Sequence, residues 1–165
     1  NKSSLPKVYG GFNTSLSWKG FDLSAIFAYS IGGYIYNRDI TMILHNGSLE
    51  GRDWSTEILK RWTPDNRNTD VPALSTTTNN WNSASTRFLQ NNSYMRLKNL
   101  TLSYNLPKQW ISKLALSSVQ VYVQGDNLFT IHRNQGLDPE QGITGITYYR
   151  YPAMRTISGG INVSF

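Results

Sequence analysis

Few side chains in this 165-residue chain have the type and spacing that catalysis or metal binding needs. The chain has no cysteine, which excludes a thiolate nucleophile, a cysteine zinc site and a disulfide within it. Its two histidines, His45 and His132, have no Ser/Asp partners or further metal ligands at useful spacing. Asp138 and Glu140 supply two carboxylates, too few oxygen ligands for a calcium site on their own. We therefore expect no enzyme, no metal centre and no cofactor.

The charge balance is basic, with 16 Lys and Arg against 10 Asp and Glu and a net charge of +6. These charges are scattered over expected loops and strand ends, whereas a nucleic-acid interface needs a clustered stripe with stacking aromatics. No apolar run is long enough for a transmembrane helix. A membrane β-barrel is compatible with this hydrophilic composition, because lipid-facing and lumen-facing residues alternate along each of its strands.

The main signal for secondary structure is the alternation of apolar and polar residues with a period of two. It predicts the strands that must position any site. At the end of the chain Ile161, Val163 and Phe165 alternate with Asn162 and Ser164, which gives that strand one apolar and one polar face. The same alternation recurs upstream, and it predicts an all-β chain. The expected strands cover about residues 8–18, 21–34, 88–106, 118–129 and 153–165.

The connections alternate between short turns and long loops, which are expected at about 35–87 and 131–152. Antiparallel up-and-down transmembrane β-barrels have this arrangement, with short periplasmic turns and long extracellular loops. Within the first loop, residues 52–62 predict a short helix with Asp53 as its N-cap and Glu57 spaced to pair with Arg61. The sequence therefore predicts part of a barrel wall with a partly structured outer loop.

Six sequence blocks, in this order along nearly the whole chain, resemble the C-terminal region of SusC/RagA-type TonB-dependent transporters. They are PKVYGGF at 6–12, FDLS at 21–24, RWTPDN at 61–66, SYMRLKNLTL at 93–102, GDNLFT at 125–130 and YPAMRT at 151–156.

The resemblance implies a barrel of about 22 strands, of which this chain supplies the last five. It also implies an outer-membrane protein of a Gram-negative bacterium that imports oligosaccharides or peptides. Import would be energised by TonB through an N-terminal segment absent here, and a SusD-like surface lipoprotein would cover the barrel mouth as a lid. Because five strands cannot close a barrel, we expect the plug and the remaining strands to lie in a longer protein.

The first long loop is the expected contact with the lid or the substrate, by position alone. Its length and short amphipathic helix suit a protein interface better than a sugar pocket. For the loop tryptophans, packing onto the barrel mouth is favoured over stacking on a ligand. The residues proposed for contact are Trp54, Trp62, Asn79, Asn80 and Trp81.

The last strand is expected to carry the signal that the barrel assembly machinery recognises. Ile161, Val163 and Phe165 share one face, and the pattern resembles that signal. The alternative role for Phe165 is anchoring at the membrane interface, as expected for Trp18 and Phe21.

Two arginines stand at positions whose parity is apolar. Arg96 shares the parity of Leu100, and Arg155 that of Ile157. By strand length both reach the outer interface, so we predict an outer-leaflet belt in which they bind lipopolysaccharide phosphates. A β-bulge near Leu97 that shifts the register is the alternative.

Two other classes of protein are compatible with parts of the pattern. A secreted carbohydrate-binding β-sandwich shares the alternation and the exposed tryptophans. An outer-membrane enzyme or a nonspecific porin would have the same kind of barrel wall. However, the sequence contains no plausible catalytic triad, and a porin would not account for the six sequence blocks.

Overall fold

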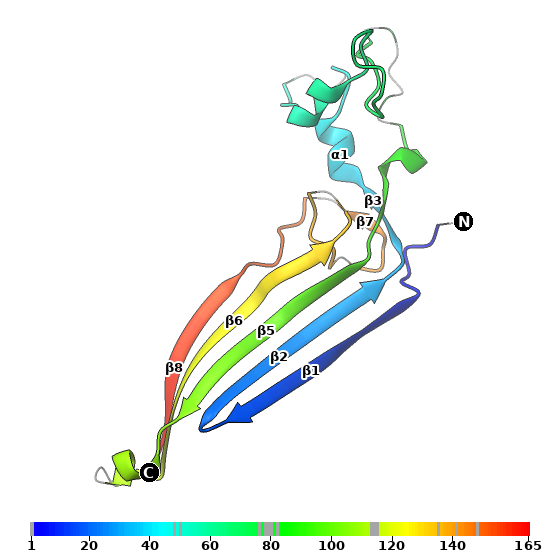
Figure 1. Cartoon of the computed structure of the whole chain (residues 1–165). Coiled ribbons are helices and arrows are strands. Elements are labelled where there is room, and N and C mark those ends of the chain that lie inside the picture. Colours follow the sequence, from blue (N-terminus) through cyan, green and yellow to red (C-terminus); the bar gives the residue numbers. More distant parts are fainter. Residues whose placement is uncertain are drawn as a thin grey trace.

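The structure is a computed structural model that describes residues 2–47, 49, 51–75, 77, 81, 83–112, 116–134, 136–140, 142–147 and 149–165. Its main element is a five-stranded antiparallel sheet in the order β1-β2-β5-β6-β8, which forms one continuous tilted wall (Figure 1). The strands are β1 (Val8–Trp18), β2 (Phe21–Ile31), β5 (Tyr94–Asn105), β6 (Ser118–His132) and β8 (Thr156–Ser164).

Four of the five expected strands have other bounds in the structure. β2 ends at Ile31 and not at residue 34, because Gly32 and Gly33 take positive φ angles of 84° and 76° that end the strand. The segment expected at 88–106 is two strands, β4 (Leu89–Asn91) and β5. β6 continues to His132, and β8 begins only at Thr156.

One face of the wall is apolar and exposed. Residues paired across neighbouring strands lie on the same face, so the register defines rows of side chains. One row runs unbroken across all five strands and consists of Trp18, Phe21, Tyr104, Val121 and Ile161. No described element covers this row, and Trp18 and Ile161 are each 64% exposed. An apolar face of this extent requires an apolar surrounding medium or a partner.

The opposite face carries hydroxyl, amide and carboxylate groups. Ser15, Ser24, Thr101, Gln124 and Ser158 form one of its rows. In the neighbouring row, Asp126 accepts hydrogen bonds from Asn99 Nδ2 at 2.7 Å and from Gln124 Nε2 at 3.3 Å. This polar face is the one that a barrel turns toward its interior.

The β-sandwich alternative is wrong, because the second sheet does not pack on the apolar face of the first. That sheet has three strands in the order β4-β3-β7, with β3 at Tyr34–Asn37 and β7 at Ile146–Thr147. It continues the wall beyond the ends of β2 and β5, on the side where the loops gather (Figure 1). β3 and β7 pair in parallel, so the two long loops are joined to each other.

Above the second sheet lies an outer lobe, formed by described residues between 38 and 88. α1 (Arg38–Ile43) begins at the cap Asn37, whose side chain accepts a hydrogen bond from the Ile40 N–H. The lobe has its own small core of Leu44, Ile58 and Val71. It is therefore a packed unit and not an open polar loop.

The helix expected at 52–62 is wrong in length, type and capping. The structure has a 3₁₀ turn, η1 (Thr56–Lys60), capped by Ser55 and not by Asp53. The ion pair of Glu57 is formed with Lys60 at 2.8 Å instead of with Arg61. A 3₁₀ turn has three residues per turn, which brings i and i+3 side chains into line.

At the opposite end of the wall, β5 and β6 are joined by a short connection that contains α2 (Lys108–Ile111). Ile111 is buried there, whereas Trp110 is 65% exposed. Among the described residues no helix is both long enough and apolar enough to cross a membrane.

Because β6 has one apolar and one polar face, substitution by arginine is expected to lower recovery of the protein on one face only. In the full-length protein, Val123→Arg places a charge on the apolar face and is expected to cost about 2 to 4 kcal/mol. Gln124→Arg is the matched control, because it places the same charge on the polar face beside Asp126. Recovery of the protein in the outer-membrane fraction should fall severalfold for the first variant only. Equal recovery of both variants would contradict the assignment of the faces.

Candidate functional site

A β-bulge in β5 sets the position of the candidate site. Ile26 pairs with Asn99 while Phe27 pairs with Leu97, so Lys98 has no partner across β2. Toward β6 the register also shifts between Leu97 and Asn99. Since side chains alternate with a period of two, one extra residue exchanges the faces of every residue that precedes it.

The bulge turns Arg96 onto the polar face. Arg96 pairs with Ala28 of β2 and Thr130 of β6, while Leu97 takes the apolar position between Phe27 and Phe129. The Arg96 side chain is 3% exposed. A guanidinium buried to this degree needs partners for its charge and for its N–H groups.

Those partners form a cluster of four charges. Arg96 Nη2 lies 2.6 Å from Asp138 Oδ1, and its Nη1 lies 2.8 Å from Glu140 Oε2. The Nε of Arg96 donates to the Thr130 hydroxyl at 2.8 Å. Lys98 Nζ lies 2.6 Å from the other Glu140 oxygen. The four charges sum to zero.

The cluster attaches the second long loop to the polar face of the wall. Asp138 also accepts the backbone N–H of Ala153 at 2.7 Å and that of Glu140 at 2.9 Å. Between the two carboxylates, Pro139 is fully buried and its carbonyl accepts from Asn92 Nδ2 at 2.9 Å. This part of the loop therefore lies against the wall, with its polar groups paired.

The ionisation of Asp138 follows from these contacts. Burial alone would raise the pKa of its carboxyl, but the N–H groups of Ala153 and Glu140 and the Arg96 guanidinium hold the pKa below its ordinary value. A carboxylate with a lowered pKa in the folded state contributes stability above its ordinary pKa, and that contribution is lost as the pH falls. The attachment of the loop therefore persists at neutral pH.

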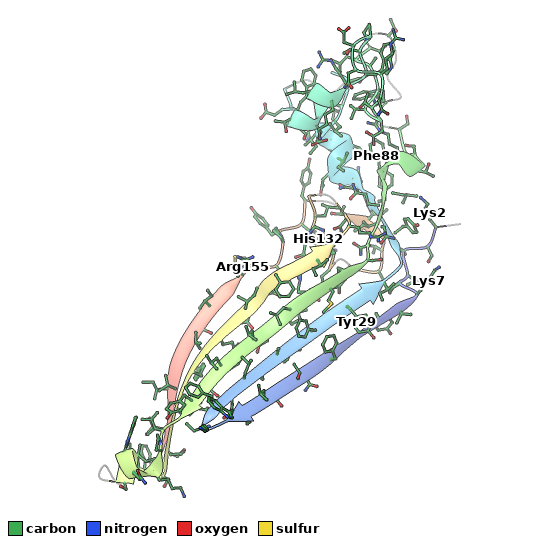
Figure 2. All side chains as sticks on the ribbon, viewed as in Figure 1. Lys2, Lys7, Tyr29, Phe88, His132 and Arg155 are labelled. Atoms are coloured by element: carbon green, nitrogen blue, oxygen red, sulfur yellow. The ribbon has the colours of Figure 1, made fainter. Side chains whose placement is uncertain are left out.

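A cavity of about 630 Å³ lies beside the cluster, between the loop and the upper ends of β6 and β8. Figure 2 labels His132 and Arg155 at these strand ends. Arg96, Thr130 and Asp138 line the cavity from the cluster side, and Arg150 and Arg155 also line it.

These positions correct the expected arginine belt. The prediction is wrong for Arg96, which is buried against two carboxylates, and the register shift given as the alternative is what the structure has. Arg155 is exposed, precedes β8 and lines the cavity, and its contact with lipopolysaccharide stays a prediction. Asp138 and Glu140 are paired with cations and do not form a calcium site.

The residues proposed for lid or substrate contact have different environments. Trp81 packs against the core of the outer lobe, with the Arg87 guanidinium 5.3 Å from its ring centroid. Trp54 packs on His45 and donates to its Nδ1 at 3.2 Å, yet it is 48% exposed. Trp62 is 43% exposed. Asn79 and Asn80 lie outside the described residues.

The residues proposed as the assembly signal follow the apolar face of β8. Val163 pairs with Val119 and Ile161 with Val121, and all four lie on the apolar face of the wall. Phe165 follows β8 and is 93% exposed. Recognition of these residues by the assembly machinery stays a prediction.

The sequence contains the four charges of the cluster, but the strand pattern does not predict that they pair. Two signals were available: an arginine of the wrong parity within a regular strand, and two carboxylates at 138 and 140 in a loop that returns to that strand. The pairing depends on a bulge whose position alternation alone does not determine.

A sheet with one exposed apolar face, one polar face and long connections packed on the polar side at one end is part of the wall of a transmembrane β-barrel. Comparison with curated proteins and solved structures identifies the kind of barrel, although no family model matches the chain.

Over its whole length the chain is similar to TonB-dependent receptors. It is 35% identical to TonB-dependent receptor P3 of Formosa agariphila and 27% identical to TonB-dependent receptor SusC of Bacteroides thetaiotaomicron, over 97% and 99% of the chain. It covers 16% of each of these relatives.

Among solved structures, the RagAB peptide importer in the open-open state matches with a TM-score of 0.86 at 36% identity. A structure of the RagAB peptide transporter matches with a TM-score of 0.87, also at 36% identity. The chain is covered to 99% and 100%, and each of those chains to 18%. The chain is thus homologous to part of the SusC- and RagA-type TonB-dependent receptors.

The charge cluster predicts that two similar substitutions lower the free energy of unfolding by unequal amounts. Arg96→Gln leaves the buried Asp138 without its cation and is expected to cost about 3 to 5 kcal/mol. Lys98→Gln removes a partner from a pair whose side chains are 32% and 38% exposed, and it should cost at most about 1 kcal/mol. Limited proteolysis of the full-length protein within residues 133–153 should accelerate strongly for the first variant alone. Similar protection in both variants would show that the cluster does not hold the loop.

Proposed function

We propose that this chain forms part of the barrel wall of an outer-membrane nutrient importer that is energised by TonB. The observation that carries the proposal is similarity to TonB-dependent receptors over the whole chain, combined with a wall of one apolar and one polar face. The apolar face lies in lipid and the polar face lines the interior. No group of side chains described here indicates catalysis.

In this proposal the outer lobe and the second loop are extracellular, and the α2 connection is periplasmic. The asymmetry of the connections supports this orientation, since long loops in bacterial barrels lie outside and short turns inside. Imported material would then meet the lobe and the loop first.

Peptides are the substrate class that we favour over oligosaccharides. The solved structures reported above belong to a peptide importer and a peptide transporter, at 36% identity. The relative named SusC is 27% identical. This is an argument from similarity alone, so the experiment must offer both classes.

Uptake by the full-length protein tests the proposed function. A strain that lacks the gene should lose growth on peptides as the limiting nutrient, and a strain without functional TonB should show the same defect. Growth on free amino acids is the control, because they pass through porins. Unchanged peptide uptake in the deletion strain would contradict import of peptides, and a defect confined to oligosaccharides would reverse the choice of substrate.

We further propose that the outer lobe binds a SusD-like surface lipoprotein. Several apolar side chains of this lobe are exposed although it has a core of its own. Leu59 is 73% exposed, and Trp62 and Trp54 are 43% and 48% exposed. Aromatic side chains at the centre of an interface often carry much of the binding energy.

Copurification tests this partner. Trp62→Ala combined with Leu59→Ser should lower the amount of lipoprotein that copurifies with the full-length protein by about tenfold or more, since two buried apolar contacts are lost. Trp110→Ala is the matched control, because Trp110 is also an exposed tryptophan but belongs to α2, in the connection between β5 and β6. Unchanged copurification in the first variant would place the interface elsewhere.

A further inference from the structure

The cavity beneath the second loop has an excess of positive charge. Three arginines line it, Arg96, Arg150 and Arg155, and Asp138 is the one carboxylate among the described residues that line it. Its volume of about 630 Å³ lies within the range of small-molecule sites. The guanidinium groups differ in what they already bind.

The guanidinium of Arg96 already has partners for its N–H groups. All three of its nitrogen positions are engaged, by Asp138, Glu140 and Thr130. Asp138 is equally committed, to Arg96 and to two backbone N–H groups. The cluster is electrically neutral once Lys98 is counted, so it neither attracts nor repels an ion strongly.

The other two arginines of the cavity, Arg150 and Arg155, are available to bind an anion. Neither makes an ion pair or a hydrogen bond with any residue that the structure describes, and both are exposed. The guanidinium of Arg150 lies beside Gly142, where an added Cβ would be 3.9 Å from Nη1 and Nη2. Arg150 therefore reaches across the loop, and Arg155 approaches the cavity from the end of β8.

We propose that Arg150 and Arg155 bind an oxyanion, a carboxylate or a phosphate, in this cavity. A guanidinium presents a planar fork of N–H groups that fits such an anion in a bidentate manner. The neutral cluster forms the opposite wall and fixes the loop that carries Arg150. This inference rests on the proposed function in one respect, that the anion belongs to an imported ligand and reaches the cavity from the polar side.

The phosphate of an outer-leaflet lipid is the second possible source of the same chemistry. The luminal source is favoured because Arg96, Thr130 and Asp138 line the cavity from the polar side of the wall, whereas Phe129 lines it from the apolar side. The experiment therefore has separate arms for the anion alone, for an imported ligand and for the lipid.

The first arm uses inorganic pyrophosphate and the purified full-length protein, with binding measured by titration calorimetry. The variant Arg150→Gln/Arg155→Gln should raise the dissociation constant by about tenfold or more, since it removes both charged donors from the anion. Arg133→Gln is the matched control, because Arg133 is exposed in the same loop but does not line the cavity. No binding by the unmodified protein, or equal binding by the double variant, would overturn the site.

The second arm compares a labelled peptide that has a free C-terminal carboxylate with the same peptide amidated. The unmodified protein should prefer the acid by about tenfold, and the double variant should lose the preference but still bind the amide. Equal binding of acid and amide beside intact pyrophosphate binding would overturn the assignment to the imported ligand. Failure of both peptides to bind would count against peptide import, while the pyrophosphate result would still decide the anion site.

The third arm measures lipopolysaccharide phosphate that copurifies with each variant. Unchanged lipid in the double variant supports the luminal source. A loss of bound lipid in the double variant, without an effect on peptide binding, would overturn that source in favour of the membrane.

Discussion

Backbone hydrogen bonding in an apolar medium is the constraint on which the rest of this structure depends. In lipid an unpaired N–H or carbonyl costs several kcal/mol, so the strands must pair along their full length. β1, β2, β5, β6 and β8 pair with one another in one antiparallel ladder, whose two outer strands, β1 and β8, each have a neighbour on one side only. Once the ladder is fixed, each side chain has only two possible directions, and the alternation of apolar and polar residues is a consequence of that choice. The rows on the two faces follow from register alone.

The bulge at Lys98 shows what a single departure from this ladder can do. Without it Arg96 would face the lipid side near the outer interface, where an exposed charge costs less than the about 2 to 4 kcal/mol of the membrane midplane. With it the guanidinium turns inward and meets Asp138 and Glu140 of the second loop. A buried ion pair adds little net stability in general, because desolvation offsets the attraction. Its value here is positional: it determines where on the polar face the loop lies.

Local patterns and contacts distant in sequence were not equally predictable. The strands were predictable because alternation is local: β1 needs only the residues from Val8 to Trp18. The sequence offers the bulge only as an alternative, since Lys98 does not differ from its neighbours in any way that alternation detects. The parallel pairing of β3 with β7 joins Tyr36 to Ile146, and no local signal relates residues so far apart. The helical spacing of Trp54, Ile58 and Trp62 favours an α-helix in the sequence, but of these three only Ile58 lies within the 3₁₀ turn and the core of the lobe, and both tryptophans are partly exposed.

The two loops are connected to each other as well as to the wall, and this determines how a force on one would reach the other. Asp39 of α1 accepts from the Tyr149 N–H at 3.0 Å, and Arg52 donates to the Tyr149 hydroxyl at 2.9 Å. The same second loop is held to β5 through Arg96. A partner seated on the outer lobe would therefore contact a unit that is hydrogen-bonded to Tyr149, in the same loop whose Asp138 and Glu140 pair with Arg96 on the polar face. Arg150 follows Tyr149 directly and lines the cavity between the second loop and the ends of β6 and β8, so a displacement of Tyr149 together with the lobe would also move a residue of that cavity.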